Sequence, residues 1–305
     1  MKIVILSRKA TLYSTRRLTQ AARRRGHTVR VLNPLDFTMV LSTRTPEIYY
    51  RGRKLDKIDA VIPRIGQSIT FYGLAVVRQF EMMGVYCVNE SNAIARSRDK
   101  LRALQVLSRE EGLGVPPTAI ARRPDYGRRM LSHVGGTPAI VKLLEGTQGA
   151  GVVIVDSKQS FDSVIDAFHA IGQNILIQNF VAEAKGRDIR AFVVGRRVVA
   201  AMTRQAIEGE FRSNVHLGGS AAKVVLTAEY RRAAVAAAAS LGLRVAGVDM
   251  LHSNDGPMIM EVNSSPGLEA IEKSSGVDVA DAVIQYVERN AKPGRPTRSG
   301  ERQGR

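Results

Sequence analysis

The chain has 305 residues and a formal net charge of +17, from 45 Lys and Arg against 28 Asp and Glu. An apolar fraction of 44% excludes a disordered chain, and no apolar run approaches the roughly 18 residues of a membrane-spanning helix. The single cysteine, Cys87, cannot form an internal disulfide, and the first residues turn polar too soon for a secretory signal. We therefore expect a cytoplasmic globular protein of two or three lobes.

The positive charge is concentrated in two segments. Residues 1–53 hold 12 Lys or Arg against two acids, and residues 291–305 hold five against one. The second segment has no apolar periodicity, which predicts a disordered basic tail. Such a charge distribution raises the local concentration of anionic partners, among which nucleic acid, ribosome, acidic peptide and nucleotide all qualify.

The first 95 residues alternate between strand-like and helix-like patterns. Strands are predicted at residues 2–6, 27–32, 59–65 and 85–89, with one helix capped by Ser14 or Thr15 and another at residues 70–83. This order predicts half of a doubly wound α/β unit. No Gly-x-Gly-x-x-Gly turn follows the first strand, which argues against a nicotinamide-binding domain.

A helix capped by Asp99 is predicted to run to about residue 111 and to end at Gly112. Lys100 lies in its first turn, where the helix dipole mildly disfavours a cation. Two interpretations follow: an ordinary solvated lysine, or a lysine that meets an anionic partner.

Two apolar runs then flank a glycine-rich segment that contains Gly146, Thr147, Gln148, Gly149 and Gly151. A strand rather than a helix follows these glycines, which argues against a P-loop and against the dinucleotide fingerprint. The segment is either a flexible hairpin turn or a loop whose backbone N–H groups close over phosphates. Lys142, in the strand before it, is as well explained as an edge residue as by a functional charge.

Three later segments add candidate ligands. An apolar strand ends at Gln178, Asn179 and Phe180, which could form a hinge for a planar base. Asp188 and Arg190 alternate and therefore share one face of a strand. Further arginines and polar groups follow at Arg204, Arg212, Ser213 and Asn214. A single arginine is more often structural than catalytic, but two or three that converge on a nucleotide and metals would neutralise developing charge.

The most informative pattern lies at residues 245–263. Two apolar runs joined by turn-forming residues 252–257 predict a β-hairpin. A turn centred near Asp255 places Asp249 opposite Glu261, with Asn263 on the same face as Glu261. Three oxygen ligands without a Cys or His cluster favour Mg²⁺ or Mn²⁺ over zinc. A solvated hairpin face is the alternative, against which the Met, Ile and Val neighbours argue.

These motifs together resemble the ATP-grasp carboxylate–amine ligases, and among them the RimK-type glutamate ligases that modify small-subunit ribosomal protein six. The motifs occur in the order Lys100, Lys142, residues 146–151, Asp188 with Arg190, residues 212–214, Asp249, and Glu261 with Asn263. The sequence is also similar to that of the RimK-type ligases at residues 2–8, 60–66, 69–73, 79–83, 95–101, 145–149 and 260–269. The resemblance covers residues 1–290 and leaves the basic tail outside.

The resemblance implies an α/β (α+β) protein in which an ATP-grasp fold follows an N-terminal doubly wound pre-ATP-grasp domain. The expected divisions are the pre-ATP-grasp domain at 1–95, a nucleotide-binding lobe at 96–180, a metal-binding lobe at 181–290 and the basic tail at 291–305. A homo-oligomer and a contact with the ribosome through the basic surface are also expected.

The implied reaction is phosphorylation of an acceptor's C-terminal carboxylate by ATP, followed by attack of glutamate on the acyl phosphate. Two Mg²⁺ (or Mn²⁺) ions would bridge the ATP phosphates on Asp249, Glu261 and Asn263. The expected nucleotide contacts are Lys100, Lys142, Gly146, Thr147, Gln148, Gly149 and Gly151 for phosphates, Gln178, Asn179 and Phe180 for adenine, Asp188 for ribose, and Arg190, Arg212, Ser213 and Asn214 nearby. Arg204 and Arg212 are the candidate catalytic residues, placed against the acyl phosphate. The basic surface would suit an acidic tail and free glutamate.

Family members often carry an acid where this chain has Asn179, so a carboxylate contact to the nucleotide is absent or is made by the amide oxygen. Two alternatives remain open at this point. One is a ligase of the same fold that joins glutamate to a small molecule, since the residues of a nucleotide site do not identify the acceptor. The other is a non-enzymatic ribosome- or RNA-binding module, which the charge favours and the 5% aromatic content disfavours.

Overall fold

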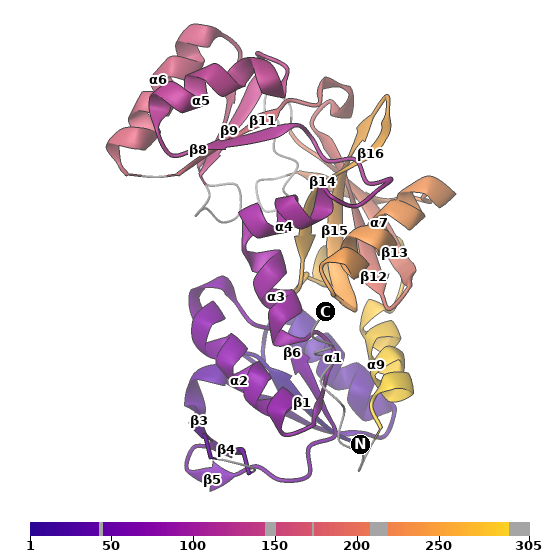
Figure 1. Ribbon diagram of the computed structural model, residues 1–305. Coiled ribbons are helices and arrows are strands. Elements are labelled where there is room, and N and C mark those ends of the chain that lie inside the picture. Colours follow the sequence, from indigo (N-terminus) through magenta and orange to yellow (C-terminus); the bar gives the residue numbers. More distant parts are fainter. Residues whose placement is uncertain (43–44, 144–150, 173, 208–218, 293–305) are drawn as a thin grey trace.

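The computed structural model describes residues 1–42, 45–143, 151–172, 174–207 and 219–292. Three regions follow one another in space: an N-terminal domain, a central five-stranded sheet, and a smaller lobe at the far end (Figure 1). Within the described residues, no helix is both long enough and apolar enough to cross a membrane.

The N-terminal domain is built on a parallel sheet of strand order β2-β1-β6-β7, as the alternating pattern predicts. Its strands are β1 (Lys2–Leu6), β2 (Thr28–Leu32), β6 (Ala60–Pro63) and β7 (Tyr86–Cys87), and its helices are α1 (Tyr13–Arg24) and α2 (Thr70–Met82). A second, antiparallel sheet that the sequence did not reveal comprises β3 (Phe37–Val40), β4 (Glu47–Tyr50) and β5 (Arg53–Lys54). Two short 3-10 turns, η1 (Pro34–Asp36) and η2 (Gln67–Ile69), complete the domain.

The predicted cap of α1 is wrong. The helix begins at Tyr13, and neither Ser14 nor Thr15 caps it. Both side chains are buried and make tertiary contacts instead: the Ser14 hydroxyl accepts from the Leu268 backbone N–H at 3.0 Å, and the Thr15 hydroxyl bonds the Ser7 hydroxyl at 3.0 Å. Residue types that often cap helices here make hydrogen bonds to other parts of the fold.

Two consecutive helices, α3 (Ser91–Arg98) and α4 (Lys100–Leu107), lead out of this domain. The prediction that Asp99 caps the second helix is confirmed, since its side chain accepts from the Arg102 backbone N–H at 3.0 Å. The helix ends earlier than expected, at Leu107, and places Lys100 in its first turn.

The smaller lobe is an antiparallel sheet of order β10-β9-β11-β8 with two helices on one face (Figure 1). Its strands are β8 (Thr118–Ala121), β9 (Ala139–Leu143), β10 (Val152–Val155) and β11 (Ile175–Asn179); its helices are α5 (Pro124–Met130), η3 (Leu131–Val134) and α6 (Lys158–Ala170). Strands β9 and β10 pair as a hairpin across the glycine-rich segment. A separate core that includes Val141, Phe161, Ile165 and Ile177 holds the lobe together.

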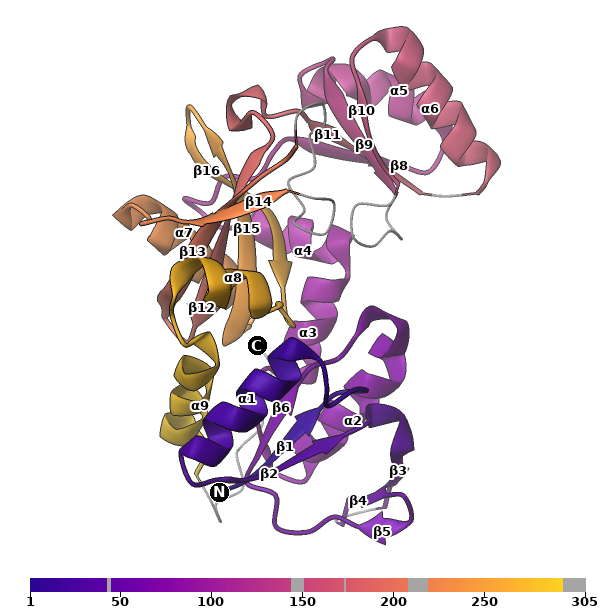
Figure 2. The same ribbon diagram turned by 180° about the vertical axis from the view of Figure 1, so that it is seen from behind.

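The central sheet has the order β14-β13-β12-β15-β16 and is antiparallel throughout. Its strands are β12 (Arg187–Val194), β13 (Arg197–Gln205), β14 (Ser220–Lys223), β15 (Val245–Ser253) and β16 (Gly256–Asn263), preceded by η4 (Ala182–Ala184). Helix α7 (Ala228–Ser240) covers one face, while α8 (Glu269–Ser275) and α9 (Val279–Asn290) lie on the other (Figure 2).

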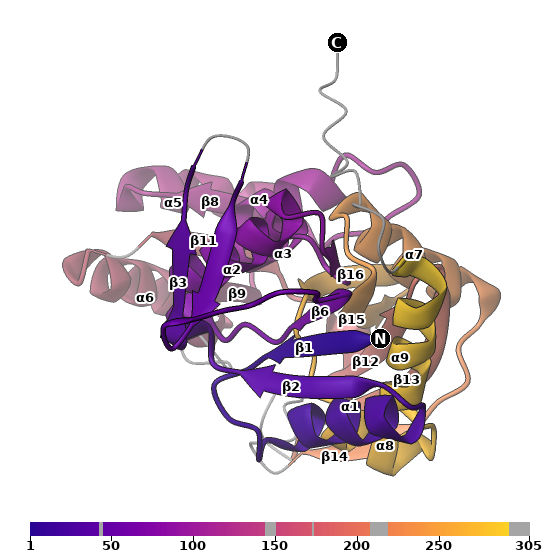
Figure 3. The ribbon, with the colours of Figure 1, turned by 90° about the horizontal axis from the view of Figure 1, so that it is seen from below.

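Successive residues of β12 point to opposite faces and so belong to different cores. Ala191 and Val193 pack in the core beneath α7. Phe192 and Val194 pack with α9 and, through it, with β1 and α1 of the N-terminal domain. The view from below shows α9 beside the first strands of the chain (Figure 3). One core therefore joins the N-terminal domain to the central sheet.

Candidate active site

A row of charged side chains crosses one face of the central sheet. Asp188 and Arg190 share a face of β12, as their spacing predicts. Their cross-strand partners are Arg204 on β13 and Asp249 on β15 respectively. The row thus alternates in charge from β13 to β15.

These four residues form a buried ion-pair network. Arg190 donates to both carboxylate oxygens of Asp249, at 2.6 Å from Nε and 2.5 Å from Nη2. Arg204 donates to both oxygens of Asp188, and its Nη2 also reaches Asp249 Oδ2 at 2.9 Å. Two-point contacts of this kind fix the guanidinium planes as well as the charges.

The network controls the charge of Asp249. Burial alone would raise the pKa of this carboxyl, but Arg190 and Arg204 outweigh burial and hold its pKa at about 2. Burial likewise opposes the charged form of Arg204, yet Asp249 and Asp188 raise its pKa. Asp249 is therefore ionised at any pH at which the protein would work.

The predicted hairpin is confirmed, with Asp249 opposite Glu261, although the reason differs from the one expected. Ser253 pairs with Gly256, so the turn consists of Asn254 and Asp255. A regular ladder from that turn would place Asp249 opposite Met260. A bulge next to Met250 shifts the register by one residue and brings the second carboxylate to the face of the first.

Glu261 is exposed to solvent at the end of the charged row. Its crowded surroundings and the nearby Asp249 carboxylate raise its pKa, against the attraction of Arg190, Lys100 and Lys142. Within the described residues no hydrogen bond or ion pair reaches its carboxylate. A cation placed here would relieve the repulsion between the two acids, so these residues suit a hard divalent ion.

The third expected oxygen ligand, Asn263, ends β16 and pairs with Gly247. Its Oδ1 accepts from the Ser265 backbone N–H at 2.9 Å. Across the described residues no three His, Cys, Asp or Glu side chains gather as a metal cluster. The candidate set is thus two carboxylates and one carboxamide.

Lys142 approaches this hairpin from the smaller lobe. Its Nζ donates to Gln178 Oε1 at 2.7 Å, and Gln178 in turn donates to the Thr118 hydroxyl at 2.9 Å. Burial lowers the pKa of Lys142 to about 8; Glu261 opposes this shift and Lys100 adds to it. Lys100 also has a lowered pKa, through burial that Glu261 partly offsets. Strand β9, helix α4 and strand β16 thus bring two lysines and a carboxylate within electrostatic range of one another.

The expected adenine hinge follows β11. Asn179 pairs with Ala139 and donates from Nδ2 to the Val134 carbonyl at 3.0 Å, so the side chain that replaces an acid holds the lobe's own backbone. Phe180, directly after the strand, is half-buried. Gly151 has φ of +72°, and a Cβ there would lie 2.7 Å from Leu143, so the end of the loop requires glycine.

Seven candidate residues lie outside the described residues. They are Gly146, Thr147, Gln148 and Gly149 of the glycine-rich segment, and Arg212, Ser213 and Asn214. Their assignments remain predictions.

The sequence analysis did not identify one residue that supports the β15–β16 hairpin. Asn89 is buried and donates to the carbonyls of Val245 and Ser264, while its Oδ1 accepts from the backbone N–H groups of Arg244 and Val245. It ties the start of β15 to the segment that follows β16. No motif marks it, because an asparagine after a short strand has many ordinary uses.

Comparisons with known proteins agree with this geometry. A probable alpha-L-glutamate ligase of Maridesulfovibrio salexigens is 57% identical over 300 residues, which cover 98% of this chain and 99% of the relative. A protein of the same name from Hydrogenovibrio crunogenus is 58% identical over 293 residues, covering 96% and 97%. The ATP-grasp ligase PsnB, solved with a phosphomimetic variant of its minimal precursor, Mg and ADP, matches with a TM-score of 0.75 at 22% identity, covering 95% and 98%.

The fold and the arrangement of the site define an ATP-dependent ligase of the ATP-grasp class. The RimK-like ATP-grasp domain matches residues 97–287 and the RimK pre-ATP-grasp domain matches residues 1–94, so the chain belongs to the RimK-like family. The expected fold is confirmed, and the non-enzymatic alternative is no longer needed.

Proposed function

We propose that this ligase joins glutamate to the C-terminal carboxylate of a protein acceptor, and that the acceptor is small-subunit ribosomal protein six. The glutamate specificity is supported by the printed names of relatives that are 57–58% identical along nearly the whole chain. A peptide acceptor is supported by the precursor peptides bound to PsnB, a structural neighbour. The small-molecule acceptor remains the alternative.

The proposal depends above all on the Asp249–Glu261 pair, which faces two lysines from other elements. Bound ATP and Mg²⁺, for which we propose two ions, would supply the phosphoryl group and the charge that activates it. Glu261, Asp249 and Asn263 would hold the metal, while Lys100 and Lys142 would neutralise phosphate oxygens.

The residues of the ion-pair network act through Asp249 in this proposal. Arg190 and Arg204 keep its carboxylate ionised and oriented. Arg204 is buried, and its Nε and Nη2 donate to Asp188 and Asp249. We therefore assign it to positioning Asp249 rather than to direct contact with the acyl phosphate. Asp188, expected to bind ribose, holds Arg204 in the same way.

The chemistry balances without further reactants. A carboxylate oxygen of the acceptor attacks the γ-phosphorus and ADP leaves. The amino nitrogen of glutamate then attacks the acyl carbon, phosphate leaves, and the nitrogen loses a proton to form the amide. A carboxylate is a poor electrophile, so the first step provides the leaving group that the second requires.

Incubation of the protein with ATP, Mg²⁺, glutamate and ribosomal protein six, followed by intact mass measurement, tests the proposal. The expected result is a mass increase of the acceptor by whole glutamate residues, with matching release of ADP. A mass increase with a different amino acid would contradict the donor assignment. ADP release with small carboxylates but unchanged protein six would favour the small-molecule acceptor.

A further inference from the structure

A basic groove lies on the central region, on the side of the sheet that α7 covers. It has a volume of about 680 Å³, within the size range of ligand-binding pockets. Five arginines line it: Arg196 from the β12–β13 turn, Arg197 at the start of β13, Arg231 and Arg232 from α7, and Arg244 before β15. All five side chains are exposed, and no carboxylate belongs to the described lining.

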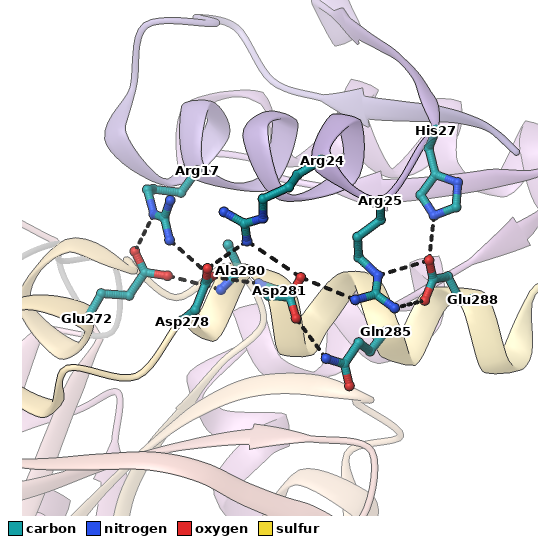
Figure 4. A network of polar contacts seen from close by, with 10 residues as sticks. All are labelled: Arg17, Arg24, Arg25, His27, Glu272, Asp278, Ala280, Asp281, Gln285 and Glu288. Atoms are coloured by element: carbon teal, nitrogen blue, oxygen red, sulfur yellow. Dashed lines mark hydrogen bonds and ion pairs between the residues drawn. The ribbon is translucent and has the colours of Figure 1, made fainter.

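These arginines differ from the basic residues of the N-terminal segment. Figure 4 shows Arg17, Arg24 and Arg25 of that segment paired with acids that follow the central sheet. In contrast, none of the five groove arginines forms an ion pair within the described part of the chain. Among the described residues, the Arg231 side chain donates to the Leu226 carbonyl, at 2.7 Å. The groove therefore gathers five arginines that the described part of the chain leaves without an acidic partner.

The floor of the groove is apolar. Val235, Ala236 and Ala239 of α7 line it together with Val198 of β13. Arg231, Val235 and Ala239 recur every four residues, so one face of the helix supplies both a guanidinium and the floor. An apolar floor inside a charged rim is the layout of a protein-binding surface.

The groove is remote from the proposed ligation site. It adjoins the β12–β13 turn, whereas Asp188 and Arg204 lie at the other ends of the same strands. Val194 lies six residue steps along β12 from Asp188, roughly 20 Å at the rise of a strand. The charged row also lies on the opposite face of the sheet from α7.

The charge and the floor together select the occupant. We propose that this groove binds an acidic peptide segment of a partner protein, whose carboxylates pair with the arginines and whose apolar side chains cover the floor. Nucleic acid fits less well because no aromatic side chain lines the groove for base stacking, and a phosphate backbone has no apolar surface to bury.

The test uses fluorescence anisotropy with a fluorescein-labelled peptide of repeated Glu-Leu-Glu-Ala units. Its C-terminus is amidated so that it offers no terminal carboxylate to the ligation site. The groove variant is Arg197→Glu/Arg232→Glu, and the matched control is Arg30→Glu/Arg53→Glu, which reverses two exposed arginines of the N-terminal domain. Binding is expected to weaken by about tenfold or more in the groove variant and by less than about twofold in the control.

Equal weakening in both variants would overturn the proposal, because it would show attraction to net charge alone. Tighter, groove-dependent binding of poly-uridylate RNA would assign the surface to nucleic acid, and a dimer lost only in the groove variant would assign it to a second copy. Urea unfolding of both variants should match that of the wild type and shows that they fold. None of these readouts depends on which acceptor is ligated, so the groove can be refuted while the proposed function stands.

Discussion

The Glu261 carboxylate is the residue on which the proposed chemistry depends most directly. Its pKa is raised because neighbouring groups displace water from the carboxylate and because the Asp249 carboxylate repels its charge. A bound divalent cation would stabilise the charged form against both effects. We expect Glu261→Gln to abolish ligation. It should leave the free energy of unfolding at pH 7 unchanged or slightly increased, because the folded state no longer holds a disfavoured charge. Unfolding by urea and ligation by mass spectrometry give the two readouts.

The same variant can contradict the assignment in either of two ways. Wild-type ligation would remove Glu261 from the site. A large loss of stability would show that the carboxylate is structural. Asp255→Asn, at the tip of the same hairpin, changes an exposed acid in the same way and should leave both properties unchanged.

Lys142 predicts a pH dependence of nucleotide binding. Its pKa of about 8 in the ligand-free protein means that it is partly neutral at mildly alkaline pH, and phosphate would favour its charged form. The dissociation constant for ATP should therefore rise above pH 8, approaching tenfold per pH unit, while Lys142→Arg should flatten the profile. A wild-type profile that stays flat from pH 7 to about 9.5 would show that Lys142 does not meet the phosphates.

The contribution of Lys142 to the free energy of unfolding changes with pH in the direction opposite to its effect on ATP affinity: it rises as the pH rises. The folded pKa lies below the ordinary value of 10.5, so the unfolded chain binds the proton more tightly. The protonated lysine therefore destabilises the fold below pH 8, and this penalty disappears as the pH rises from about 8 to 10.5.

The β15–β16 hairpin was predicted from the sequence in part: its strands and its acidic pair, but not its bulge. Alternation and turn residues predicted two strands and an Asp249–Glu261 pair, and both are present. The bulge that creates the pair was not predictable, because no residue type is specific to it and the nearby Met260 fits a regular strand equally well. Roles carried by residues 146–149 and 212–214 remain predictions of the family resemblance alone.

At the scale of elements, the contact between α1 and the α8–α9 segment neutralises arginines of the N-terminal segment that composition alone assigned to anionic partners. Glu272 accepts from the Tyr13 hydroxyl at 3.1 Å, from Arg17 Nε at 2.9 Å and from the Ala280 backbone N–H at 3.0 Å. Asp278 pairs with Arg24 and Glu288 pairs with Arg25 further along the two helices (Figure 4). Composition could not reveal this pairing, because the partners are more than 250 residues apart in the chain.

This contact makes Glu272 and Glu269 a matched pair for mutation. Glu272→Gln weakens three hydrogen bonds at a buried carboxylate and should lower the free energy of unfolding by about 1–3 kcal/mol. Glu269→Gln changes an exposed acid that pairs with Lys273 on the same helix, and should cost less than about 0.5 kcal/mol. Urea unfolding of both proteins measures the difference. Equal effects would mean that the buried carboxylate does not hold the helices together.

At the scale of the whole molecule, the cores do not follow the order of the chain. Helix α9, near the C-terminus, packs in one core with β1 and α1, so the N-terminal domain and the central sheet depend on each other. The smaller lobe has a core of its own. Lys142 belongs to that lobe and Glu261 to the central sheet, so the proposed site requires both parts to be folded and correctly placed.

Ile284→Ala tests this division of the molecule. Ile284 is fully buried in the shared core, and its truncation should cost about 2–5 kcal/mol, whereas Val225→Ala at an exposed position should cost almost nothing. Hydrogen exchange should become faster in β1, α1, β12 and α9 together, because they share one core, while exchange in β9 and β11 stays unchanged. If α9 alone exchanged faster, the N-terminal domain would be stable without it. If β9 and β11 accelerated equally, the two cores would unfold as one cooperative unit, and the smaller lobe would not be an independently stable part of the molecule.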